Sequence, residues 1–138
     1  MKELELDRLT LQVKTRGEPF KILIVDDEQW VREVFKDFCD LTDVLDVDIA
    51  VGGADAIDKV REKKYDLVTM DLIMPEVSGL EALSEIKRVS PSLPIVVITG
   101  NATDKLINQA GVLGACKVMY KPIRLEDFMM EVTSALVT

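Results

Sequence analysis

The sequence contains no histidine among its 138 residues, and this absence removes several kinds of chemistry. Without an imidazole, the chain cannot build a serine-histidine-aspartate triad, a zinc site with histidine ligands, or a phosphohistidine of its own. If phosphoryl groups pass through this protein, they must therefore come from another molecule.

Cysteines and long apolar runs are also scarce. Cys39 and Cys116 form no CxxC pair and lie in apolar stretches, so we expect buried, reduced thiols and a cytoplasmic protein. No segment approaches the length of a membrane span, and the opening MKELELD lacks the basic and apolar parts of a signal peptide. The sequence therefore predicts no membrane partner.

Basic residues are fewer than acidic ones, 17 against 25, which gives a formal net charge of -8. Nucleic acids and anionic membranes require a positive surface, so neither is expected as a direct partner. The length suits a single domain whose core needs no disulfide or structural metal. We expect the partner to be a protein or a small cationic species.

From Phe20 onward, short apolar runs alternate with helical patterns in five repeats. This alternation predicts an α/β fold, a doubly wound (βα)5 three-layer sandwich with a five-stranded parallel sheet. KILIV and PIVVIT are almost wholly apolar, as strands covered on both faces require. The expected strands are 20–25, 47–51, 66–70, 95–99 and 117–120, and the expected helices are 28–40, 54–63, one beginning near 76, 103–112 and 125–136.

Residues 1–17 stand apart from these repeats as an amino-terminal extension, and residues 18–138 form the predicted domain. Apolar residues of the extension alternate as in a strand, while some also fit a helical stripe, so periodicity leaves both open. The segment is either frayed or docked on its own domain or on a neighbouring subunit. The residues in question are Leu4, Leu6, Leu9, Leu11 and Val13.

Polar residues follow or close four of the predicted strands: Asp26 with Asp27, then Asp71, Thr99 and Lys121. The carboxyl ends of parallel strands meet at one edge of a sheet, so these side chains should share a crevice. Crowded carboxylates repel one another unless a cation joins them, and a lysine with a hydroxyl can hold an oxyanion. The set predicts an aspartate that accepts a phosphoryl group on a Mg2+ platform.

Four motifs follow one another along the chain: Asp26-Asp27, DLIMPEVSG beginning at Asp71, Thr99-Gly100 and Lys121-Pro122. In this order they resemble the receiver domain of bacterial two-component response regulators, over about residues 20–136. The resemblance implies a flavodoxin-like fold and a partner, a sensor histidine kinase or a histidine phosphotransfer protein, that donates the phosphoryl group.

The resemblance assigns roles around Asp71, which would be the phosphoacceptor. Mg2+ would be bound by Asp27, Asp71 and the backbone carbonyl of Ile73, with Asp26 acting mainly through bound water. The acidic pair could also simply cap the following helix, which is compatible with metal binding. Gly79 is expected to permit close backbone packing behind Asp71.

Lys121 and Thr99 would contact oxygens of the phosphoryl group in the receiver-like arrangement. The resemblance also implies a cis peptide bond between Lys121 and Pro122. Ile73 and Asn101, two residues after Asp71 and Thr99, would tune the loss of the phosphoryl group to water.

The residues expected to respond to phosphorylation depart from the family pattern. Receivers commonly carry an aromatic residue three positions before the lysine, and Val118 occupies that position. Tyr120 lies on the same face of the strand, so one hypothesis is that it substitutes by sensing movement of Thr99. The alternative is that Tyr120 simply packs there. Trp30 is expected at the rim of the crevice and Met130 on an outward helix face.

These observations favour a phosphorylatable receiver in a phosphorelay, which switches a surface for a downstream protein or for a homodimer. It would catalyse only its own phosphorylation and dephosphorylation. One alternative is a receiver-like interaction module with weak or absent phosphorylation control. Another is an aspartate-nucleophile phosphohydrolase, although Asp71-Leu72-Ile73 lacks the DxD motif of such enzymes. We expect a single-domain regulator or an excised receiver, without a DNA-binding domain.

Overall fold

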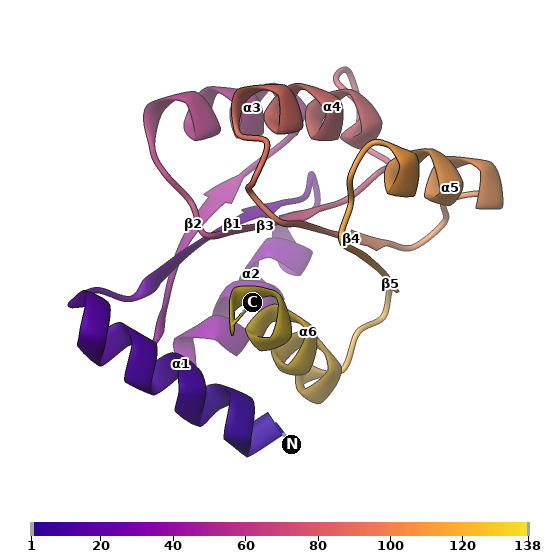
Figure 1. Ribbon diagram of the computed structural model, residues 1–138. Coiled ribbons are helices and arrows are strands. Elements are labelled where there is room, and N and C mark those ends of the chain that lie inside the picture. Colours follow the sequence, from indigo (N-terminus) through magenta and orange to yellow (C-terminus); the bar gives the residue numbers. More distant parts are fainter. Residues whose placement is uncertain (1, 138) are drawn as a thin grey trace.

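A computed structural model describes the backbone of residues 2–137 and the side chains of residues 7–137. Five strands form one parallel sheet in the order β2-β1-β3-β4-β5 (Figure 1). The doubly wound α/β fold predicted from the alternating pattern is therefore confirmed. The strands are β1 Phe20–Val25, β2 Leu45–Ala50, β3 Leu67–Met70, β4 Ile95–Thr99 and β5 Lys117–Tyr120.

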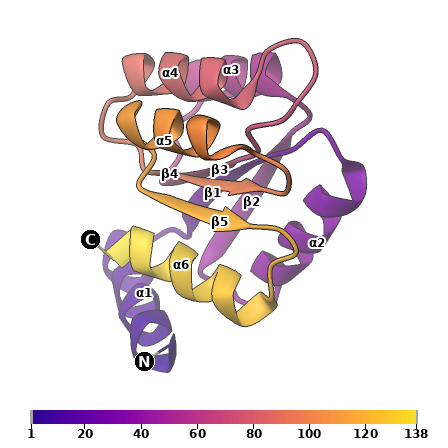
Figure 2. The ribbon, with the colours of Figure 1, turned by 90° about the vertical axis from the view of Figure 1, so that its right-hand side faces the viewer.

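Helices cover both faces of the sheet (Figures 1 and 2). Helices α3, α4 and α5 lie on one face, and α1, α2 and α6 lie on the other. Within residues 2–137, no helix combines the length and apolar character needed to cross a membrane. The helices are α1 Lys2–Arg16, α2 Gln29–Asp40, α3 Gly53–Glu62, α4 Gly79–Val89, α5 Asp104–Val112 and α6 Leu125–Val137.

Strand β1 shows why the central runs are apolar throughout. Leu23 and Val25 join the core beneath α3 and α4, whereas Ile22 and Ile24 join the core beneath α2 and α6. Successive side chains of a strand point to opposite faces, so a strand covered on both sides needs apolar residues at every position.

Two predicted element starts differ from the observed ones by two residues or more. Strand β2 begins at Leu45 rather than residue 47, and α4 begins at Gly79 rather than near Glu76. Ser78 caps α4 by accepting a hydrogen bond from the Glu81 amide, as part of a capping box. Glu76 has a left-handed φ of 64°. This conformation keeps it out of the helix.

One burial prediction was wrong. Cys116 is exposed, because it lies just before the edge strand β5, whereas Cys39 is buried as expected; both thiols are free. On α6, Met130 is half-buried, whereas its neighbour Met129 packs against the core shared with α2. Apolar neighbours in sequence indicate burial poorly at the edge of a sheet, where one side has no partner strand.

The amino-terminal segment forms helix α1, which decides between the strand and the helix that periodicity left open. Leu9 is fully buried in the core shared with α2 and α6, and α1 packs along α6. Arg16 stacks its guanidinium over the Phe20 ring at 4.3 Å and contacts Asp66 at 3.3 Å. The described part of the segment therefore docks on the same chain, while the division at residue 17 stays a prediction.

Candidate functional site

The sheet brings its polar strand ends to one edge. Asp26 and Asp71 follow the last residues of β1 and β3, which are paired in register, and Thr99 ends β4. Lys121 follows β5, and its amide donates to the Thr99 carbonyl at 3.0 Å. The structure thus places all of these predicted site residues in one crevice.

Lys121 is the cation at the centre of the site. Its Nζ lies 2.7 Å from Asp26 Oδ2, 3.1 Å from Asp71 Oδ2 and 3.7 Å from Glu28 Oε1. Burial by itself lowers the pKa of Lys121, but the hydrogen bond to Asp26 and the nearby carboxylates outweigh it, so the pKa is raised. The lysine therefore stays charged.

Asp26 is almost fully buried, with 2% of its surface exposed. Burial raises its pKa despite the hydrogen bonds that its carboxylate accepts from Lys121 and from the Glu28 amide. A buried carboxylate in this position gains from any cation that approaches it, because little water is present to solvate its charge.

The Asp71 carboxylate is held by three donors. The Thr99 hydroxyl and the Ile73 amide each donate to Oδ1 at 3.1 Å, and Lys121 donates to Oδ2 at 3.1 Å. Thr99 is fully buried and Asp71 is 4% exposed. The contacts fix the carboxylate in one orientation at the floor of the crevice.

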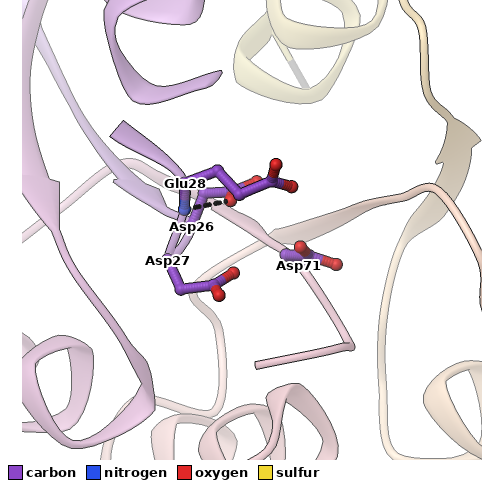
Figure 3. Close-up of side chains that lie close together, drawn as sticks. All are labelled: Asp26, Asp27, Glu28 and Asp71. Carbon is purple, nitrogen blue, oxygen red and sulfur yellow. Dashed lines mark hydrogen bonds between the residues drawn. The ribbon is translucent and has the colours of Figure 1, made fainter. Parts of the chain in front are cut away.

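Four carboxylates converge above this floor (Figure 3). One oxygen from each of Asp26, Asp27, Glu28 and Asp71 lies within 4.8 Å of the others; Asp27 and Glu28 are exposed, and the other two are buried. Hard cations such as Mg2+ take carboxylate oxygens and keep several waters, and a half-open acidic cluster suits that preference. The residues therefore fit Mg2+. Ile73 engages Asp71 through its amide, and the metal role of its carbonyl stays a prediction.

Glu28 is a member of this cluster that the sequence pattern predicts only as the start of a helix. It is the N-cap of α2, but its side chain makes no capping hydrogen bond, so the carboxylate can lie over the crevice. Its Oε2 accepts a 3.0 Å hydrogen bond from the Trp30 indole, which is 60% exposed at the rim as expected. The run of three acids after β1 was the available signal.

The residues of the predicted switch lie apart. Thr99 is fully buried, Val118 packs partly buried beneath the α3, α4 and α5 face, and Tyr120 is 58% exposed. In this conformation Tyr120 does not fill the core behind Thr99. The Lys121-Pro122 peptide bond is cis, as predicted, and Asn101 is exposed beyond the end of β4.

Comparison with known proteins agrees with this geometry. The chain is 30% identical over 132 residues to the chemotaxis protein CheY of Treponema pallidum, covering 94% of this chain and 92% of that protein. It is 33% identical over 104 residues to CheY of Thermotoga maritima, covering 75% of this chain and 87% of that protein.

A solved structure has a similar fold. The chain resembles a protein in the CheX-CheY-BeF3-Mg complex from Borrelia burgdorferi with a TM-score of 0.84 and 25% identity, over 91% of this chain and 95% of that one. The family model described as response regulator receiver domain matches residues 22–133. The chain therefore belongs to the response regulator receiver domain family of two-component signalling systems.

Proposed function

We propose that Asp71 accepts a phosphoryl group from a phosphohistidine on a sensor kinase or a histidine phosphotransfer protein, in the presence of Mg2+. The observation that carries this proposal is the placement of Asp71 between the Thr99 hydroxyl and the Lys121 ammonium, below a cluster of carboxylates. The switch is assigned to residues 18–138, with residues 1–17 as an extension.

In the proposed step, an Asp71 oxygen attacks phosphorus and the bond from phosphorus to the donor imidazole nitrogen breaks. The imidazole leaves with the electron pair of that bond, and the phosphoryl group remains on Asp71 as an acyl phosphate. Lys121 and Thr99, which contact Asp71 at rest, then turn to the phosphoryl oxygens. Their donors stabilise the negative charge that the transfer brings into the crevice.

Asp27 and Asp71, with Glu28 and Asp26 beside them, are the residues that would hold Mg2+. When bound, the ion supplies the positive charge that reduces repulsion between these carboxylates and the incoming phosphoryl group. Asp26 is already committed to Lys121 and to the Glu28 amide, so its part is that of a partner through water. The carbonyl of Ile73 completes the proposed ligand set.

Phosphorylation adds about -1.5 to -2 units of charge and new acceptor oxygens, which draw the Thr99 hydroxyl from the Asp71 carboxylate to the phosphoryl group. The loop after Thr99 leads into α5, where Val112 is 88% exposed and Leu113 37% exposed. We take this apolar surface, together with exposed Tyr120 on β5, as the one whose binding changes. Its partner is a downstream protein or a second copy of this chain.

The proposal limits catalysis to the protein's own phosphorylation and to loss of the group to water. Ile73, 48% exposed, and Asn101 flank the approach to Asp71 and would tune that loss. A cytoplasmic location in bacteria belongs to the same proposal, because the two free thiols suit a reducing compartment.

One observation favours a second candidate, a receiver-like interaction module with weak phosphorylation control. Val118 replaces the usual aromatic residue, and Tyr120 points to solvent rather than into the space behind Thr99. In that case Asp71 would still be phosphorylated, but phosphorylation would not change the binding of the partner.

The deciding experiment follows intact mass after incubation with acetyl phosphate and Mg2+. We expect one added phosphoryl group in the wild type, none in Asp71→Asn, and a normal adduct in the control Asp58→Asn, which changes an exposed carboxylate on α3. An adduct that persists in Asp71→Asn would refute the assignment. Partner binding or self-association measured with beryllofluoride then separates the two candidates.

A further inference from the structure

Arg32 lies on the first turn of α2, beneath the loop that carries the acidic residues. Its Nη1 donates a 2.7 Å hydrogen bond to the backbone carbonyl oxygen of Asp26. Its own amide donates to the Glu28 carbonyl at 3.2 Å, which closes the first turn of the helix. The side chain therefore reaches back from the helix to the start of the acidic loop.

Asp26 is held at every polar atom, and Arg32 supplies one of the four attachments. The Asp26 amide donates to the Ala50 carbonyl at 3.2 Å, and its carboxylate accepts from the Glu28 amide at 2.9 Å and from Lys121 at 2.7 Å. Its carbonyl is bound by Arg32. That carbonyl belongs to the peptide unit leading into Asp27, so its direction sets where Asp27 and Glu28 project.

The packing of Arg32 is costly in itself. Among the described residues, its Nε finds no hydrogen-bond partner although the atom is buried. Buried donors without partners are destabilising, and an apolar side chain at this position would leave no donor unsatisfied. A purely structural residue here would thus be better served by methionine or leucine. The geometry singles out the carbonyl contact as the purpose of the side chain.

We propose that Arg32 is a positioning residue for the cation site. By fixing the Asp26-Asp27 peptide unit, its guanidinium makes the carboxylates of Asp27 and Glu28 converge with that of Asp71. Residues outside a metal site that orient its ligands commonly change metal affinity by 10–100-fold when they are replaced. This inference rests on the proposed function, since it assumes that Mg2+ binds at the cluster.

The test measures Mg2+ affinity by calorimetry in the unphosphorylated protein, with urea unfolding in parallel. We expect Arg32→Met to weaken Mg2+ binding about tenfold while keeping the fold. Arg32→Lys can still donate to the Asp26 carbonyl, so its Mg2+ affinity should lie within about threefold of the wild-type affinity. Arg61→Met is the matched control, because it removes the same group from an exposed position on α3 where it pairs with Glu85.

Equal Mg2+ affinity in the wild type and a folded Arg32→Met would overturn the inference and leave the proposed function intact. Absence of Mg2+ binding in the wild type would instead overturn the metal site itself. If Arg32→Met does not keep the wild-type circular dichroism spectrum, Arg32→Gln, whose amide is too short to reach the carbonyl, takes its place with the same expectation. Failure of both variants to fold would make Arg32 a folding residue and would also overturn the inference.

Discussion

A Cβ atom on Gly79 would lie 2.1 Å from the carbonyl oxygen of Asp71 and 2.4 Å from the Cα of Leu72. Both contacts are with backbone, which cannot turn aside as a side chain can. The first residue of α4 is therefore packed directly against the peptide that follows the proposed phosphoacceptor, and this agrees with the expected role of Gly79.

We predict that Gly79→Ala destabilises the protein by about 3 kcal/mol, because overpacking forces the backbone apart. The shift also displaces Asp71, so phosphorylation by acetyl phosphate should fall. Gly111→Ala on α5 is the control, since beyond the adjoining residues and backbone of its own helix a Cβ there would meet no described atom within 4 Å. That change should stabilise by about 0.5–1 kcal/mol through helix propensity. Similar urea midpoints for the two variants would contradict the close approach.

Helix α1 offers a second matched pair. Leu9 is fully buried against the core of α2 and α6, whereas Leu11 on the same helix is 66% exposed. Leu9→Ala should lower the free energy of unfolding by about 2–5 kcal/mol. Leu11→Ala should change it by less than about 0.5 kcal/mol. Urea unfolding measures both. If Leu9→Ala proves as mild as Leu11→Ala, α1 does not contribute to the core in solution.

Trp30 should report cation binding, because its indole donates to Glu28, a member of the carboxylate cluster. We predict that Mg2+ changes the emission of this single tryptophan, that EDTA reverses the change, and that Glu28→Ala abolishes most of it. Mg2+ at ten times its dissociation constant should also stabilise the fold by about 1.4 kcal/mol. If Asp27→Asn shows the same emission change at the same Mg2+ concentration as the wild type, the ion binds elsewhere.

Asp48 gives a pH dependence away from the crevice. The Tyr65 hydroxyl donates to its carboxylate at 2.6 Å and Lys63 lies at 3.2 Å, so the pKa of Asp48 falls below the ordinary 3.8. A lowered carboxyl pKa stabilises the fold above the unfolded value, and the contribution is lost as pH falls through the folded value.

Asp48→Asn should therefore have a lower urea midpoint than the wild type at pH 7, and the two midpoints should approach each other below about pH 4. Tyr65→Phe, which keeps the ring and removes the hydroxyl, should partly reduce the pH dependence of the urea midpoint. A difference between wild type and Asp48→Asn that is constant from pH 7 to pH 3 would show that the ionised carboxylate is not what stabilises this edge of the sheet.

The sheet and the meeting of its polar ends followed from sequence because both depend on short-range rules. Apolar runs of strand length, such as the one ending at Val25, and the polar residues after them specify where each strand stops. Since parallel strands all end at one edge, the convergence of Asp26, Asp71, Thr99 and Lys121 needed no further information.

Other features depended on contacts that the sequence does not encode locally. Glu28 entered the site because its side chain makes no capping hydrogen bond to the helix, and Arg32 because its side chain reaches back across a turn. Cys116 was expected to be buried from apolar neighbours, but the edge position of β5 is a property of strand order. The sequence of residues 2–16 fits a helix and a strand alike, and packing against α6 is what favours the helix α1.

The three hydrogen bonds to Asp71 bear on the timing of its reaction. An ionised carboxylate offers about four lone-pair sites, and Thr99, Ile73 and Lys121 already use three donors on this one. A phosphoryl donor and a metal ion cannot both reach the carboxylate until one of these contacts is released. In the proposed function, the resting contacts of Asp71 therefore add to the barrier that any phosphoryl donor, acetyl phosphate included, must cross.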